Sequence, residues 1–158
     1  MSKPQLLTLL LAIQDDEILL AMKKRGFGAG MWNGAGGKVE PGETIEEAMI
    51  RETREEIQIK PLEYERVAVH TFTFDTGKVA EVHTYTCKKW QGTPLETEEM
   101  APKWFKLDQI PYNSMWPDDA LWLPFVLDGK KLVTAFTFNE YNEVINAHIE
   151  VVEKLPEL

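Results

Sequence analysis

The stretch from residue 37 to residue 59 constrains the fold more than any other part of the chain. Thr44 can serve as the N-cap of a helix, and Glu47, three residues later, completes a capping box. At about 100° per residue, one stripe of this helix is apolar, as on the buried face of an amphipathic helix. Its members are Ile45, Ala48 and Met49. The sequence therefore predicts a helix that begins after Thr44 and packs one face against the rest of the protein.

Acidic residues continue this buried stripe two turns later. Glu52 and Glu56 lie on it, and Glu55 lies beside them. An acidic helix usually presents its acids to solvent, but here the acids extend the apolar stripe instead of opposing it. Carboxylates held together on an inward face repel one another and lose hydration, so they persist only when protonated or bound to cations. Hard divalent ions such as Mg²⁺, or Mn²⁺ as a substitute, take carboxylate oxygens and share their remaining sites with phosphates. The pattern predicts a divalent-metal site.

Two neighbouring features support this site. Gly36 and Gly37 lack side chains, which would let the Gly36 carbonyl join the metal ligands. Arg51 lies four residues before Glu55 and can pair with it on the helix surface.

The spacing of six residues in this stretch resembles the Nudix box, the signature of the Nudix hydrolases. The matching residues are Gly37, Glu43, Arg51, Glu52, Glu55 and Glu56. The resemblance implies an α/β (α+β) fold, an α/β/α sandwich with a mixed, partly curved central sheet. The chain departs from the box at Thr53, where an apolar residue is usual, and at Gln58, where glycine is usual. Because glutamine lacks the easy left-handed conformation of glycine, we expect the helix end to be shifted.

Length and composition predict a single globular domain over residues 1–158. Apolar residues make up 44% of the chain and aromatic residues 10%. The only cysteine, Cys87, excludes an internal disulfide. No apolar run approaches the ~20 residues of a membrane span, and Pro4 with the acids at 15–17 favours a first strand over a signal peptide. We therefore expect a cytoplasmic protein with no membrane association.

The net charge indicates which kinds of partner the protein can bind. The formal charge is −9 and no basic cluster occurs, which argues against polymeric nucleic acid. A small nucleotide remains compatible, because a metal can neutralise its phosphates. We expect a monomer.

Apolar alternation and turn residues predict the remaining elements. Strands are expected over 5–13, 17–24, 66–74, 79–87, 103–107, 131–138 and 144–152, and a second helix over 118–127. Pro61 is expected to break the chain after the first helix, and 111–117 to be irregular.

The second informative stretch is Met115–Trp122, with the sequence MWPDDALW. One interpretation is an ordinary helix start, because proline followed by aspartates suits a helix N-terminus and its dipole. The other is a base pocket, in which Trp116 offers a flat face while Asp118 and Asp119 contact a base edge. Two adjacent buried acids that share one proton could both accept and donate hydrogen bonds. Such a pair suits a guanine-type edge, and moving the proton suits an adenine-type edge.

Together with the box, this stretch is similar to the Nudix subfamily that hydrolyses oxidised purine nucleoside triphosphates, 8-oxo-dGTP and 2-oxo-dATP. The similar segments are 23–39, 91–94, 98–100, 104–111 and 115–122. The resemblance implies a substrate pocket formed by Thr8, Lys23, Phe27, Asn33, Ala35, Gly36, Gly37, Lys38, Phe72, Phe74, Trp116, Pro117, Asp118, Asp119 and Trp122, with Phe138 at its rim. Ala80 stands where the family often has a larger residue, which leaves the exact base preference open.

These features predict a pyrophosphohydrolase that releases monophosphate and pyrophosphate. The expected catalytic residues are Glu56, Glu55, Glu52, Arg51 and Glu99, and the expected metal ligands are Gly36, Glu52, Glu55, Glu56 and Glu99. Glu56 is our first choice of general base, but the sequence does not separate it from Glu52, nor does it indicate which phosphorus is attacked. Two alternatives stay open. One is a Nudix hydrolase of a methylated purine nucleotide, a dinucleoside polyphosphate or a nucleotide sugar, and the other is a catalytically silent nucleotide-binding module.

Overall fold

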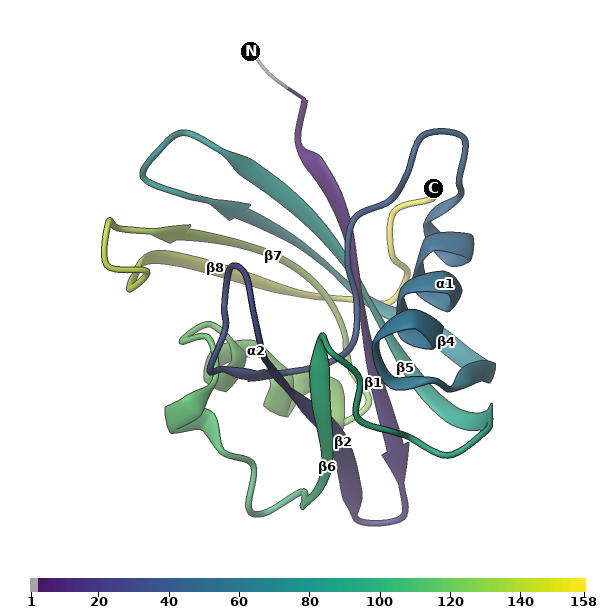
Figure 1. The fold of residues 1–158 in the computed structure, drawn as a ribbon. Helices are drawn as coiled ribbons and strands as arrows, with labels where there is room; N and C mark the ends of the chain where they lie inside the picture. The colour runs from purple at the N-terminus through teal and green to yellow at the C-terminus, as the bar shows by residue number, and fades with distance from the viewer. Residues whose placement is uncertain (1–2) are drawn as a thin grey trace.

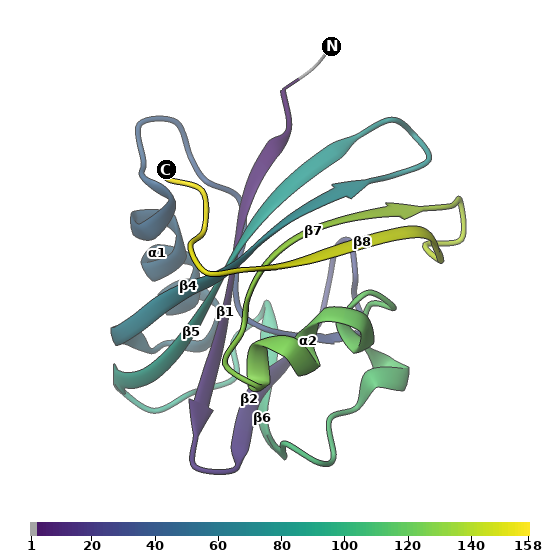
Figure 2. The ribbon, with the colours of Figure 1, turned by 180° about the vertical axis from the view of Figure 1, so that it is seen from behind.

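The computed structural model describes residues 3–158, which form one sheet with helices on its two sides (Figures 1 and 2). The strands are β1 (Gln5–Gln14), β2 (Glu17–Lys23), β3 (Trp32–Asn33), β4 (Lys60–Thr73), β5 (Val79–Gln91), β6 (Met100–Lys106), β7 (Lys131–Phe138) and β8 (Val144–Val152). The helices are α1 (Ile45–Ile57), the 3-10 helix η1 (Tyr112–Ser114) and α2 (Asp119–Leu127). No helix within residues 3–158 is long and apolar enough to cross a membrane.

The sheet is mixed and open. Its strands follow the order β3-β2-β1-β5-β4-β7-β8, and β6 pairs with β2. The β1–β5 and β4–β7 pairs are parallel, and the other pairs are antiparallel. The predicted α/β architecture is confirmed.

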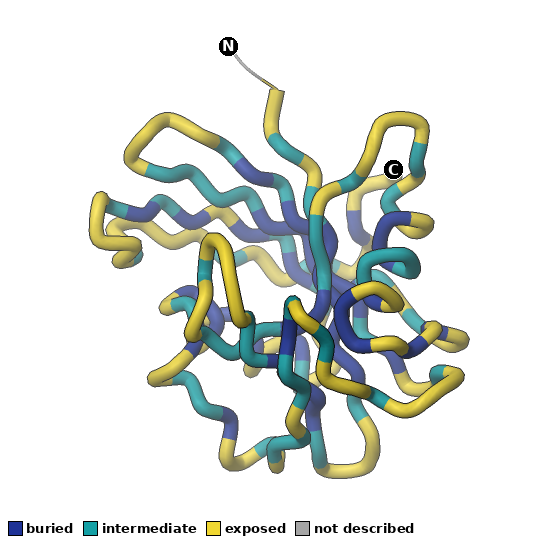
Figure 3. Tube along the Cα trace, in the orientation of Figure 1, coloured by how far each residue is buried: buried dark blue, intermediate teal, exposed yellow. Residues whose placement is uncertain are grey.

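Alternating side chains of the central strands form a core on each face of the sheet. In β1, Leu9 and Leu11 join the cluster that contains α2 residues, whereas Leu10 packs with Met49 of α1. Because both faces are covered, β1 carries a continuous apolar run rather than alternating with polar residues. Figure 3 shows the buried segments gathered in the middle of the sheet, while the tips of the β4–β5 and β7–β8 hairpins are exposed.

Helix α1 begins as the sequence predicts. Thr44 is the N-cap, and both hydrogen bonds of its capping box with Glu47 are present. The buried face includes Met49 and continues through Thr53 and Glu56. Thr53 is fully buried, and its hydroxyl donates to the Met49 carbonyl at 2.7 Å. That hydrogen bond explains how a polar side chain replaces an apolar one at this position.

The end of α1 differs from our expectation. The helix is not shifted, because Gln58 itself adopts the left-handed conformation, with φ 62° and ψ 33°. Its backbone N–H donates to the Arg54 carbonyl at 3.0 Å, which closes the last turn. The chain therefore keeps the geometry of a glycine cap and tolerates the strain of a side chain there.

Replacing Gln58 with glycine is expected to stabilise the protein by about 1 kcal/mol, because the exposed Gln58 side chain makes left-handed backbone costly. For a chain of this length the melting temperature should rise by about 2–4 °C. Gln109→Gly provides the control, since Gln109 is exposed but lies outside the left-handed region, and this variant should melt lower. A Gln58→Gly protein that melts at or below the wild-type temperature contradicts the strain argument.

Several other boundaries need correction. Pro61 does not break the chain, because it lies inside β4 and pairs with Trp90 of β5 next to a register shift. That irregularity lets a proline without an N–H enter the strand. Both β4 and β5 are accordingly longer than expected, and β6 begins three residues earlier, at Met100. The strands predicted over 131–138 and 144–152 are confirmed.

Candidate functional site

The glycine-rich segment before α1 fills the gap where β1 and β2 diverge. Thr8 donates its backbone N–H to the Gly37 carbonyl at 2.9 Å, and Leu10 donates to the Ala35 carbonyl at 2.7 Å. The contact with β1 is so close that a Cβ atom on Gly36 would lie 1.8 Å from the Thr8 carbonyl oxygen. Only glycine allows this approach, which brings the segment next to the acids of α1.

Glu56 is the acid of α1 that is buried. Its carboxylate is buried, with 8% of the residue exposed, and accepts a hydrogen bond from the Gly36 backbone N–H at 2.6 Å. Burial raises the pKa of Glu56 to about 7, and the negative charges of Glu52 and Glu99 act in the same direction. The Gly36 hydrogen bond and the Lys23 charge lower it. A carboxyl with a pKa near neutrality can exchange a proton at working pH, as a general base must.

Glu52 lies directly against the glycine segment. A Cβ atom on Gly37 would lie 2.4–2.8 Å from the carboxylate atoms of Glu52. Because Gly37 has no side chain, the Glu52 carboxylate can occupy this position.

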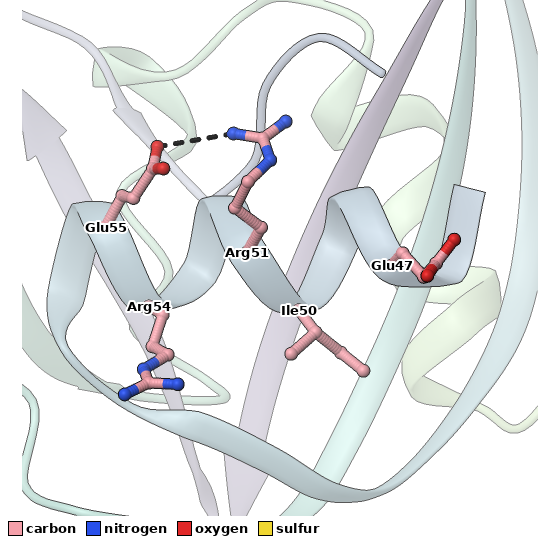
Figure 4. Close-up of a pocket in the computed structure, with 5 residues that line it drawn as sticks. All are labelled: Glu47, Ile50, Arg51, Arg54 and Glu55. Carbon is pink, nitrogen blue, oxygen red and sulfur yellow. Dashed lines mark hydrogen bonds and ion pairs between the residues drawn. The ribbon is translucent and has the colours of Figure 1, made fainter. Parts of the chain in front are cut away.

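Arg51 organises the outer acids. Its guanidinium binds both carboxylate oxygens of Glu43, at 2.6 and 2.9 Å, and reaches Glu52 at 2.9 Å. These hydrogen bonds hold the pKa of Glu43 at about 2. The expected Arg51–Glu55 pair is present at 3.3 Å (Figure 4), so Glu55 is one of several partners and Glu43 is the main one. Figure 4 also shows Arg54 and Ile50 projecting from the opposite side of α1.

The predicted metal ligands are only partly assembled. Glu52, Glu56 and Glu99 interact electrostatically, whereas Glu55 is 59% exposed and paired with Arg51. Glu99 is paired with Arg25, with Nη2 and Oε1 2.5 Å apart. Within residues 3–158, no group of three or more acidic, histidine or cysteine side chains stands in a metal-holding arrangement. The donor chemistry still fits a hard divalent ion, because the charged form of Glu56 is disfavoured by burial and a nearby cation would relieve that cost.

A cavity of about 490 Å³ joins this acidic region to the start of α2. Most of the predicted pocket residues line it: Thr8, Lys23, Phe27, Asn33, Gly36, Gly37, Lys38, Phe72, Phe74, Trp116, Asp118, Asp119 and Trp122, together with Glu56 and Phe138. Two predicted residues do not line it. Ala35 packs in the cluster with Ile57 of α1, because its Cβ points to the opposite face of the sheet, and Pro117 is exposed.

Asp118 and Asp119 form the polar end of the cavity. Both are buried, with 3% and 4% exposed. Burial raises the pKa of Asp118 to about 6. Burial and the neighbouring Asp118 charge raise the pKa of Asp119 well above its usual range. Such a pair retains a proton near neutral pH, so it can present both a donor and an acceptor.

The contacts of this pair disfavour the helix-start interpretation. Asp118 is the N-cap of α2, but its side chain makes no capping hydrogen bond and instead accepts from the Trp122 indole N–H at 2.8 Å. Among the described residues, the Oδ2 atom of Asp119 and the hydroxyl of Thr8 are buried without a hydrogen-bond partner. Both residues line the cavity, where a ligand could supply the missing bonds.

Aromatic rings form the walls of the cavity. Phe27 is 65% exposed and packs on Trp116 at a ring-centroid distance of 5.1 Å, and Phe74 stacks on Phe138 at 5.4 Å. Flat apolar walls with a few polar groups are typical of sites that bind small aromatic ligands.

Several residues that line the cavity are not predicted from the sequence. His70 has no metal-ligand spacing in the sequence, yet it lines the cavity and is fully buried. The alternation of β4 places it on the same face as Phe72, and that periodicity could have identified it. Lys78 and Asn142 also line the cavity, from the tips of two hairpins, where no sequence pattern pointed to them.

The Gly37→Ala substitution is expected to lower activity by about 10- to 100-fold, because the added Cβ would displace the Glu52 carboxylate, a predicted catalytic group, and a shift of about 1 Å is costly. Steady-state hydrolysis and a thermal melt would check this. Gly129→Ala is the control: its φ is +84° and nothing lies within 4 Å of the added Cβ, so it adds backbone strain far from Glu52. Equal activity losses in the two variants would contradict the prediction.

Comparison with known proteins agrees with the site. Residues 4–126 match the NUDIX domain family. The chain is 43% identical to the mouse oxidized purine nucleoside triphosphate hydrolase, with 97% of this chain and 99% of the mouse protein aligned. It is 41% identical to the zebrafish protein of the same name, with 96% and 97% aligned. Among solved structures, the mutator MutT protein from Bacillus halodurans superposes with a TM-score of 0.83 at 27% identity, covering 92% of this chain and 97% of that one. With Glu56 of the box lining the cavity and these matches along nearly the whole sequence, the chain belongs to the Nudix family.

Proposed function

We infer that this protein hydrolyses oxidised purine nucleoside triphosphates, such as 8-oxo-dGTP and 2-oxo-dATP, to the monophosphate and pyrophosphate. The observation that carries this inference is the buried Asp118–Asp119 pair, which shares one cavity with Glu56. The names and near full-length identity of the mouse and zebrafish relatives support the same substrate class.

The base is proposed to bind at the α2 end of the cavity. The ring would lie between Phe27, Phe72 and Trp116, with Asn33 hydrogen-bonding its edge. For a guanine-type base, one aspartate accepts from the ring N–H and the amino group, while the protonated partner donates to the exocyclic 6-oxygen. Because the shared proton can reside on either acid, the pair can serve both guanine-like and adenine-like edges.

The phosphates are proposed to lie at the glycine-segment end of the cavity. Lys23 and Lys38 line this end and provide positive charge. Glu52, Glu56, Glu99 and the Gly36 carbonyl are the proposed holders of a divalent ion, with Glu55 as a further acid. When bound, that ion, Mg²⁺ in our proposal with Mn²⁺ as a substitute, would neutralise phosphate charge and polarise a phosphorus centre.

Glu56 is the proposed general base. Its carboxylate is held by the Gly36 N–H at 2.6 Å, and its pKa of about 7 lets it take a proton from the attacking water near neutral pH. Arg51 is proposed to act through its hydrogen bonds to Glu52 and Glu55, which fix the outer acids.

Other expectations from the sequence stay predictions. These are the monomeric state, the cytosolic location and a partner range limited to small nucleotides.

The proposed function is tested by Mg²⁺-dependent pyrophosphate release from 8-oxo-dGTP, 2-oxo-dATP, dGTP and dATP at equal low concentration. Strong preference for the two oxidised purines is the expected result. Hydrolysis without that preference would overturn the base-pocket assignment while leaving the phosphate chemistry intact. Nucleotide binding without pyrophosphate release from any substrate would instead indicate a silent binding module.

A further inference from the structure

His70 stands in an unusual polar row inside an apolar core. It lies on β4, directly opposite Thr134 of β7. On its other side, Thr84 of β5 lies diagonally across from it, two residues beyond its paired residue Val82. Its Nδ1 is 2.7 Å from the Thr134 hydroxyl oxygen and its Nε2 is 3.0 Å from that of Thr84. All three side chains are buried. Both ring nitrogens are therefore satisfied, and the plane of the ring is fixed from two strands.

The ring is also fixed in its protonation state. Burial lowers the pKa of His70 to about 3, and the charge of His83 acts in the same direction. A neutral imidazole has one donor and one acceptor nitrogen, and a threonine hydroxyl can satisfy either one. The ring stays uncharged near neutral pH and has no nitrogen left over for a metal or a substrate.

The faces of the ring contact two residues of the cavity wall. His70 is nearly parallel to Phe72, at 8° with the centroids 5.6 Å apart, and it packs against Trp122 at 4.3 Å and 47°. Trp122 in turn donates its indole N–H to Asp118 at 2.8 Å. A continuous set of contacts thus links the anchored imidazole to the carboxylate pair.

We propose that His70 is a positioning residue for the purine end of the cavity. The two threonines hold its ring, the ring holds the Trp122 indole, and the indole N–H sets the direction in which Asp118 faces the base. This inference rests on the proposed function, because it assigns His70 to the recognition of the base. It differs from a purely structural role, in which the histidine only fills the core.

The test compares His70→Phe with Leu132→Ala. His70→Phe keeps an aromatic ring but removes both hydrogen bonds. Leu132 is fully buried in the core cluster that contains Trp122 and does not line the cavity, so Leu132→Ala controls for lost core packing. Thr134→Val, which removes only the Nδ1 partner, is the milder variant if His70→Phe folds poorly.

Two measurements separate positioning from packing. In His70→Phe, KM for the preferred oxidised purine should rise about tenfold while kcat changes less than about threefold, as expected for contacting residues of one network. In the ligand-free protein, the Trp122 indole ¹H–¹⁵N signal, identified by its loss in Trp122→Phe, should shift and exchange faster with solvent. Leu132→Ala should change neither KM nor this signal.

The outcomes are distinct. An unchanged KM and an unchanged indole signal in His70→Phe, or the same KM rise in Leu132→Ala, would overturn the positioning role. If wild-type protein hydrolyses none of the purines, the proposed function fails. The indole signal, which needs no substrate, then shows by itself whether His70 positions Trp122.

Discussion

Replacing Glu56 with glutamine is expected to reduce turnover by at least ~100-fold, at the low end of general-base effects, while the fold stays intact. Glutamine has nearly the same shape, and its amide oxygen can still accept the Gly36 N–H, so the local structure is preserved. It cannot take a proton from water. Single-turnover hydrolysis of 8-oxo-dGTP, with folding checked by a thermal melt, would measure the effect.

The matched control is Glu46→Gln, on the exposed first turn of the same helix, which should retain wild-type turnover. Near-wild-type turnover in Glu56→Gln would show that another group removes the proton, and Glu52 would be the next candidate.

The Glu56→Gln substitution should also change how the stability of the metal-free protein depends on pH. The pKa of Glu56 is about 7 in the folded state, against an ordinary value of 4.5. The folded state therefore binds this proton more tightly, and its contribution to stability is complete below pH 4.5 and lost as pH rises through about 7. Relative to Glu56→Gln, the wild type should lose on the order of 3 kcal/mol over this range and then level off. Denaturant unfolding in EDTA across the range would check this, and parallel curves for the two proteins would contradict it.

The sequence predicts the local features of this molecule well. The Thr44–Glu47 capping box and the hairpin formed by residues 131–138 and 144–152 depend on neighbouring residues, and they are present as expected. The inward direction of Glu56 follows from helix periodicity for the same reason.

Features that depend on distant parts of the chain could not be predicted in this way. The parallel pairing of β1 with β5 joins segments about 75 residues apart, and no local periodicity encodes it. The pairing of Glu99 with Arg25 depends on the β2–β6 register, which places their loops side by side. Gln58 shows the converse limit: its local preference disfavours the left-handed conformation, but the tertiary structure imposes it.

The second large effect is expected at the paired aspartates. Asp119→Asn should weaken purine binding by about 10- to 100-fold, because a mismatched hydrogen bond leaves a buried polar group unsatisfied, which costs about 1–3 kcal/mol. Asparagine always donates from its nitrogen and can no longer exchange a proton with Asp118, so the pair cannot adapt to the base edge. Divalent-metal binding should be nearly unchanged, since neither aspartate is among the proposed metal holders. Asp118→Asn should behave similarly, with the further loss of a charged acceptor for the Trp122 N–H.

Calorimetric titration with the nucleoside monophosphate of the preferred oxidised purine measures purine binding. A separate titration with Mn²⁺ measures divalent-metal binding. Asp128→Asn is the control, because Asp128 lies at the exposed C-terminal end of the same helix. In the wild type, purine binding should also weaken as pH rises through the pKa values of the pair, about 6 for Asp118 and higher for Asp119, because ionisation of both acids removes the donor. If both asparagine variants bind the nucleotide as tightly as Asp128→Asn does, the two acids only begin a helix, and the base must be recognised by Asn33 and the aromatic walls.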